Sequence, residues 1–177
     1  MLDKKFWLDL EWRFDYKTPI PDLMAQIQKD VDESIENGYD DIQFWLGSDS
    51  QVYPKKGKIK YVVAIVMYRV SQGARIYFAN KETDIPRGLK KQPLARVRLW
   101  NEVYWSVMVS DVFEPKLMEL GYLVDEVHAD VNEDKSFLSN EVMAAVLGYI
   151  TSKGYVGKAK PDAYSASKAA DRRLKKR

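Results

Sequence analysis

Apolar residues early in the chain recur with the period of a helix. They are spaced by four positions: Leu23, Ile27, Val31 and Ile35. This spacing places them along one face, so residues 22–36 are predicted to form an amphipathic helix that Asn37 and Gly38 end. The aromatic-rich segment 6–14 before this helix is expected to be extended and to pack against the rest of the protein.

Three apolar segments follow, and they are predicted to be strands over residues 41–49, 61–68 and 74–79. The middle segment is a near-continuous run rich in Val and Ile, which is typical of a strand covered on both faces. Turns at Pro54–Gly57 and at Gln72–Gly73 separate the three segments. Short connections of this kind predict an antiparallel meander.

The second half of the chain alternates between helical and extended patterns. Pro93 begins a long helix, predicted over about residues 94–110, with Ala95, Leu99, Val103 and Val107 on one face. The further predicted elements are a strand over 122–131, a helix over 138–151, a strand over 154–159 and a helix over 163–176. Strand–helix–strand units imply parallel pairing, so the chain is expected to form an α/β fold with a mixed sheet.

Length and composition indicate one globular domain over residues 1–177, with an N-terminal extension and helix (1–40) before a core (41–177). The chain has no cysteine, which excludes disulfides and thiolate metal sites and suits a reducing compartment. Its first residues mix acids with bases and precede no apolar run, so no signal peptide is expected. No segment has the apolar length that a bilayer requires, and a cytoplasmic location is expected.

The net charge of +2 does not by itself indicate nucleic acid, but its distribution is uneven. Basic residues cluster in 55–58, 87–91 and 172–177, and acidic residues cluster in 22–41 and 125–134. Separated patches suit a polyanion bound on one face, with the acids at a metal site or on a distant surface. The alternative is that these clusters are solvated loops and tails.

Four acidic residues occupy positions where core elements are expected to end or face inward. Asp49 closes the first predicted strand, Asp130 ends the fourth, and Asp162 heads the last helix. Glu102 falls three residues after Leu99, on the helix face that should meet the sheet. An ionised carboxylate facing inward is costly unless a cation compensates it.

Several carboxylates without His or Cys ligands favour a hard divalent cation such as Mg²⁺ or Mn²⁺. Each acid alone has a simpler interpretation. Asp162 would serve as a helix N-cap, Asp49 as a turn residue and Glu102 as a surface residue of its helix. Their joint placement favours the metal site.

The same residues carry a resemblance to a known superfamily. The motifs that carry it are Gly47-Ser48-Asp49-Ser50-Gln51, Glu102, His128-Ala129-Asp130-Val131-Asn132 and Lys160-Pro161-Asp162-Ala163-Tyr164-Ser165-Ala166-Ser167. Over about residues 41–173 the chain resembles the ribonuclease H-like superfamily, and more narrowly a family of small bacterial and phage proteins known as predicted ribonuclease H-like nucleases. This resemblance implies a five-stranded mixed sheet of order 3-2-1-4-5, with its first three strands antiparallel and helices flanking it. It also implies that Asp49, Glu102, Asp130 and Asp162 hold two Mg²⁺ or Mn²⁺ ions.

The sequence departs from the superfamily pattern at several positions. Ser50 follows the first aspartate where ribonuclease H enzymes often have glycine, and Gln51 stands where the exonuclease branch has glutamate. The single histidine, His128, is expected on a strand, as a hydrogen-bonded structural residue or as a group that tunes the metal. The fourth acid is Asp162 or Asp171; Asp162 is preferred, because Asp171 would lie over ~13 Å further along a helix.

The resemblance predicts a metal-dependent nuclease that hydrolyses phosphodiester bonds by a two-metal-ion mechanism. RNA–DNA hybrid, structured RNA and branched DNA all remain open as substrates. The expected phosphate-binding residues are Lys55, Lys56, Arg96 and Arg98. The alternatives are a catalytically silent nucleic-acid-binding module, or an enzyme for another phosphoryl substrate, which the absence of a glycine-rich phosphate loop disfavours.

Overall fold

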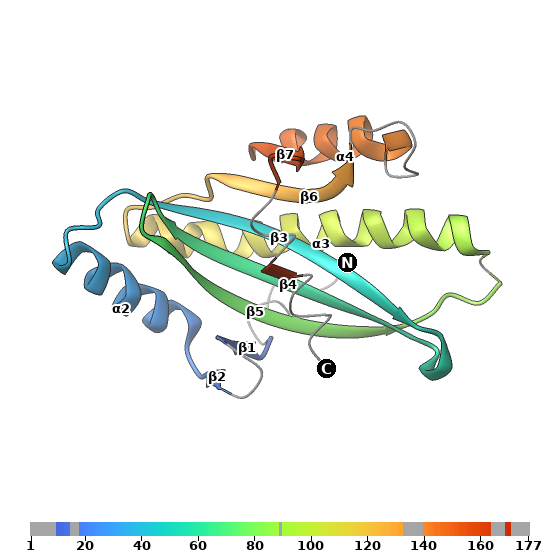
Figure 1. Ribbon diagram of the computed structural model, residues 1–177, viewed down its shortest axis with the longest axis horizontal. Coiled ribbons are helices and arrows are strands. Elements are labelled where there is room, and N and C mark those ends of the chain that lie inside the picture. The colour runs from blue at the N-terminus through green and yellow to red at the C-terminus, as the bar shows by residue number, and fades with distance from the viewer. Residues whose placement is uncertain (1–9, 15–17, 89, 133–139, 164–168, 171–177) are drawn as a thin grey trace.

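A computed structural model of the protein describes residues 10–14, 18–88, 90–132, 140–163 and 169–170 (Figure 1). Its strands are β1 (Trp12–Arg13), β2 (Pro19–Ile20), β3 (Ile42–Tyr53), β4 (Lys58–Arg69), β5 (Gly73–Asp84), β6 (Glu126–Asn132) and β7 (Gly157–Lys160). Its helices are α2 (Leu23–Glu36), α3 (Lys91–Glu119) and α4 (Asn140–Ser152), with a single 3-10 turn, η1 (Pro54–Lys56). Within these residues no helix is both long and apolar enough to cross a membrane.

In the described part of the chain the strands form one mixed sheet of order β2-β1-β5-β4-β3-β6-β7. Strands β3, β4 and β5 form an antiparallel meander that is paired along its whole length. Strand β6 lies parallel to β3, and β7 lies parallel to β6. The sheet has seven strands instead of the predicted five, because β1 and β2 extend it beyond β5 through the pair Arg13 and Phe78. The other five strands stand in the predicted order, 3-2-1-4-5. Strands of two residues are too short to show a period in the sequence.

The helix α2 begins where capping chemistry allows it. Asp22 precedes the first turn, and its carboxylate accepts a hydrogen bond from the Ala25 amide at 3.0 Å. This bond satisfies one of the amides that a helix leaves unpaired at its start. Asn37 then closes the last turn.

The helix α3 runs well past the predicted end at Ser110, to Glu119. Val109, Phe113 and Leu117 are spaced by four residues among themselves and are buried, which keeps the helix on the sheet despite Pro115. The next strand starts at Glu126 rather than at the predicted residue 122. Most of the helix predicted over 163–176 lies outside the described residues, as do residues 6–9 of the aromatic segment and the whole of the basic cluster 172–177.

The sheet is packed on both faces. On one face, alternate residues of the strands share a core with α2, α3 and α4; Leu46, Ile65 and Val107 are fully buried there. On the opposite face, Ala170 packs against Val62, Ala64 and Val66 of β4. Every residue of β4 from 61 to 67 is therefore buried, as its continuous apolar run predicted.

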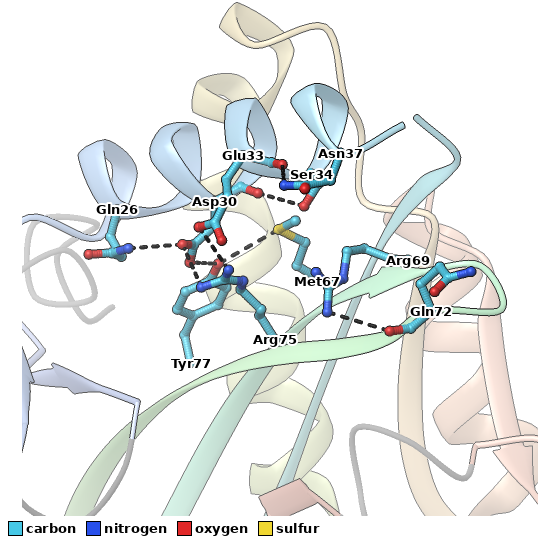
Figure 2. Close-up of polar contacts among 10 residues, drawn as sticks. All are labelled: Gln26, Asp30, Glu33, Ser34, Asn37, Met67, Arg69, Gln72, Arg75 and Tyr77. Atoms are coloured by element: carbon cyan, nitrogen blue, oxygen red, sulfur yellow. Dashed lines mark hydrogen bonds and ion pairs between the residues drawn. The ribbon is translucent and has the colours of Figure 1, made fainter. Parts of the chain in front are cut away.

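A buried polar cluster fixes α2 to β5 (Figure 2). Asp30 on α2 is 1% exposed and accepts hydrogen bonds from the Tyr77 hydroxyl at 2.7 Å and the Gln26 amide at 3.0 Å. The guanidinium of Arg75 lies 3.0 Å from the Asp30 carboxylate and 2.9 Å from that of Glu33. Burial and the Asp30 charge raise the pKa of Tyr77 far above its usual range, so the hydroxyl stays a donor. The buried charge of Asp30 is thus compensated by two hydrogen-bond donors and the guanidinium of Arg75.

Candidate metal centre

Glu102 is the most deeply buried of the four candidate acids. It lies on α3 with 4% exposure, on the face that meets β3, as its spacing from Leu99 predicted. The Ser50 hydroxyl donates a hydrogen bond to the Glu102 carboxylate. Arg98, one helical turn earlier, donates to the same Ser50 hydroxyl at 2.7 Å and lies 3.8 Å from the carboxylate. Glu102 is therefore held by one hydroxyl and one cation.

Small serines allow α3 to lie close to β3 at this point. The Ser48 hydroxyl donates to the Glu102 carbonyl oxygen, and Ser106 donates to that oxygen at 3.0 Å and contacts the Ser48 hydroxyl at 3.1 Å. All three residues are buried. These bonds fix the position of Glu102 relative to Ser48 on β3.

Asp49 and Asp130 occupy equivalent places on the neighbouring strands β3 and β6. The two strands are paired from Trp45 and Glu126 to Gly47 and His128. Asp49 and Asp130 each follow two residues after the last pair, so on regular strands both point to the face that carries His128. Neither acid ends its strand, which corrects the prediction: β3 continues to Tyr53 and β6 to Asn132.

Strand β6 is irregular at Asp130. Its pairing with β7 shifts between His128 and Asn132, and Asp130 lies midway through the shift. An extra residue in a strand redirects the side chains beside it. Here the carboxylate of Asp130 forms an ion pair with the ammonium of Lys160 on β7.

The negative charges of Asp49 and Asp130 act on the Glu102 carboxyl group. Its pKa is raised from 4.5 to about 8, first by burial and then by the negative charges of Asp49 and Asp130, while the Ser50 bond and Arg98 lower it. The acids are close enough to repel one another. Even so, the described residues contain no group of three acidic or histidine side chains placed together as the ligands of one metal ion.

Asp162 is exposed in the turn after β7, and Ala163 after it is not helical. The next residues of the predicted helix, 164–168, lie outside the described residues. The acids that raise the pKa of Glu102 are Asp49 and Asp130. Asp171 falls outside the described residues, so the choice between these two late acids stays a prediction.

The four basic residues expected to bind phosphate divide into two groups. Lys55 and Lys56 are exposed in η1, the turn between β3 and β4, and Arg96 is exposed near the start of α3. Figure 1 shows η1 and the first turns of α3 toward the same end of the molecule. Arg98, in contrast, is bound to Ser50 beside Glu102. Its guanidinium therefore contacts Ser50 and lies near the Glu102 carboxylate.

His128 has a structural environment. It is 2% exposed, its Nε2 lies 2.8 Å from the Glu126 carboxylate, and its ring lies 5.5 Å from that of Trp45. Burial lowers its pKa. The hydrogen-bonded structural role that its strand position suggested is the one observed.

Two partners of the acids had little signal in the sequence. Arg98 stands four residues before Glu102, a spacing at which helical side chains meet, but its bond to Ser50 depends on how α3 packs. Lys160 lies within the last motif, and its contact with Asp130 depends on the shifted pairing of β6 and β7.

The fold is that of an α/β protein with a mixed sheet and a long helix, whose three acids Asp49, Glu102 and Asp130 interact through their charges. The chain belongs to the Ribonuclease H-like family, which it matches over residues 22–175. It is also similar to the uncharacterized protein YkuK of Bacillus subtilis (strain 168), with 27% identity over 158 residues that cover 85% of this chain and 88% of the relative. No solved structure gives a significant match.

Proposed function

We propose that this protein is a metal-dependent nuclease that hydrolyses phosphodiester bonds in nucleic acids. The observation that carries the proposal is the buried carboxyl group of Glu102, whose pKa the neighbouring charges of Asp49 and Asp130 help to raise to about 8. Acids that repel one another in a buried place are typical of functional sites, because a ligand of opposite charge relieves the repulsion. Membership of the Ribonuclease H-like family supports a nuclease-like module.

The donor set fits Mg²⁺ or Mn²⁺. Asp49, Glu102 and Asp130 offer carboxylate oxygens, which hard divalent ions prefer, and Asp162 would complete the set from the turn after β7. Two such ions supply an activated water and charge stabilisation at the leaving oxygen in phosphoryl transfer. Glu102 needs a cation most, because its carboxylate is both buried and flanked by acids.

Other residues of the chain have separate tasks in this proposal. Arg98 and the Ser50 hydroxyl hold the Glu102 carboxylate in place at β3. Lys55, Lys56 and Arg96 contact backbone phosphates, which position a nucleic acid without reading its sequence. The substrate is RNA, an RNA–DNA hybrid or structured DNA.

A second candidate function is a nucleic-acid-binding module without turnover. Two contacts favour it: the ammonium of Lys160 neutralises Asp130, and the guanidinium of Arg98 lies 3.8 Å from Glu102. Protein cations that neutralise acids reduce the need for a metal ion.

A substrate panel separates the two candidates. Labelled hybrid, duplex RNA, single strands and a four-way junction are each incubated with Mg²⁺, Mn²⁺ or EDTA. The nuclease predicts product on at least one substrate, with either ion and not with EDTA. Binding that persists in EDTA, with no product at high protein concentration and long times, would establish the binding module.

Metal binding itself is tested by thermal unfolding. Mn²⁺ should raise the melting temperature by an amount that grows with its concentration, since an ion that binds the native state stabilises it by about 2.7 kcal/mol at 100 times its Kd. Asp49→Asn should lose most of this shift. Asp30→Asn is the control, because it removes one carboxylate charge from the α2–β5 cluster and leaves the proposed ligands unchanged. An equal shift in Asp49→Asn and the parent would place the ion elsewhere.

A further inference from the structure

We infer that Lys160 is an exchangeable counter-cation of the acid site, which holds Asp130 until a divalent ion displaces it. The inference rests on the proposed function, because it concerns how the proposed ion gains access to its ligands. It assigns Lys160 a role that neither the motif around it nor the family match gives it.

The contact between Lys160 and Asp130 is built into the sheet. Lys160 is the last residue of β7, and the shifted pairing of β6 with β7 presents the Asp130 side chain beside it. The side chain of Asp130 is 22% exposed and that of Lys160 is 40% exposed. A half-exposed ammonium can leave for water at little cost, since ion pairs at such positions are weak.

Charge makes the lysine and the metal ion mutually exclusive at Asp130. Asp49, Glu102 and Asp130 carry three negative charges when ionised, and Arg98 and Lys160 bring two positive ones. A divalent ion bound between these acids with Lys160 still in place would put like charges in direct contact, which is unfavourable. Lys160 therefore weakens metal binding and must move away when the ion binds.

Arg98 does not share this role. Its guanidinium is held by the Ser50 hydroxyl and the Ser50 carbonyl oxygen as well as by its proximity to Glu102. Several fixed hydrogen bonds orient a planar guanidinium firmly, whereas a lysine ammonium ends a flexible stem. Arg98 is a positioning residue, and Lys160 is the cation that exchanges.

Lys158 provides a matched control. It lies on the same strand, two residues before Lys160, and its side chain is 38% exposed. It is 3.7 Å from Glu126, which is not one of the proposed ligands. Removing either lysine changes the net charge equally, so only the specific contact with Asp130 differs.

The experiment is calorimetric titration of Mn²⁺ into the wild type, Lys160→Met and Lys158→Met at low ionic strength. Lys160→Met should bind Mn²⁺ about tenfold more tightly, which corresponds to about 1.4 kcal/mol. Lys158→Met should stay close to the wild type. Equal affinities of the two variants would overturn the role of Lys160 and leave the metal site intact. Absence of Mn²⁺ binding in all three proteins, Lys160→Met included, would overturn the metal site and this inference together.

A second variant keeps the test valid if Lys160→Met does not fold, which circular dichroism would show. Lys160→Arg keeps the charge and can hold a carboxylate through two parallel hydrogen bonds. It should bind Mn²⁺ more weakly than the wild type. Affinity equal to or higher than that of the wild type would contradict the competition.

Discussion

Two buried acids on helices, Asp30 on α2 and Glu102 on α3, occupy opposite kinds of environment. Both are less than 5% exposed. Asp30 is surrounded by donors, with Tyr77 and Gln26 hydrogen-bonded to it and Arg75 at 3.0 Å (Figure 2). Glu102 has one serine hydroxyl and a more distant guanidinium, and two further acids repel it.

The difference separates a structural carboxylate from one suited to a ligand. A buried charge that is fully paired fixes the elements that carry its partners, as Asp30 fixes α2 to the sheet. A buried carboxylate that two further acids repel costs stability, and such groups are typical of functional sites. Burial alone would not distinguish the two residues; the identity of their neighbours does.

The largest expected effect is a loss of nuclease activity when one of the acids that act on Glu102 is removed. Asp130→Asn should lower nuclease activity by more than about a hundredfold, a common cost of removing one charge-stabilising group at a reaction centre. Binding of nucleic acid should stay equal or become slightly stronger, because a negative charge near the phosphates is lost. Cleavage assays and fluorescence anisotropy on the same substrate measure both. Retained cleavage would remove Asp130 from the site.

The next effect is on stability, and it should differ in kind between the two acids. Asp30→Asn should lower the free energy of unfolding by about 2–3 kcal/mol, because the new amide leaves buried donors without an acceptor. Glu102→Gln should unfold no more easily than the wild type at neutral pH, since the amide is neutral and still offers an oxygen to Ser50. Urea unfolding of the two variants tests this contrast. Equal destabilisation would mean that both acids are structural.

The pH dependence of stability should sharpen the same contrast. The pKa of Glu102 is about 8 in the folded protein against an ordinary value of 4.5, so the folded state binds more protons than the unfolded state between these values. Stability is then greatest below about pH 4.5 for this group and falls as the pH rises toward 8, by at most about 1.4 kcal/mol per unit. Unfolding of the wild type and Glu102→Gln at pH 5, 6.5 and 8 measures the slope. The variant should lack this component, and parallel slopes would contradict it.

The sequence predicted the parts of the fold that local patterns determine. The meander was readable because β3, β4 and β5 are apolar runs separated by turn residues, and α2 because its apolar period agrees with the stop at Asn37 and Gly38. The pair of two-residue strands, β1 and β2, could not be read, since they depend on pairing with β5 rather than on a pattern of their own.

The candidate site was predictable in the same partial way. The burial of Glu102 followed from its distance to Leu99 on one helix face. The ion pair of Asp130 with Lys160 and the bonding of Arg98 to Ser50 join segments far apart in the chain. Such contacts are set by strand register and helix packing, which no short motif encodes.

The smallest expected effect lies outside both acids, at the basic turn η1. The double variant Lys55→Gln/Lys56→Gln should bind nucleic acid more weakly. It should also reduce the slope of log K against log salt by the amount that two phosphate contacts contribute. Each phosphate contact releases counterions and adds about 0.9 to the slope on duplex DNA. Mn²⁺ affinity should persist, since both side chains are exposed in the turn that follows the end of β3. Lys29→Gln, on the exposed surface of α2, is the control for loss of one charge and should leave the slope unchanged. Anisotropy titrations at several salt concentrations give the slopes. If Lys29→Gln also reduces the slope, by a similar amount per charge, then net charge attracts the nucleic acid. The location of the lysines in η1, near the start of α3, would then not matter.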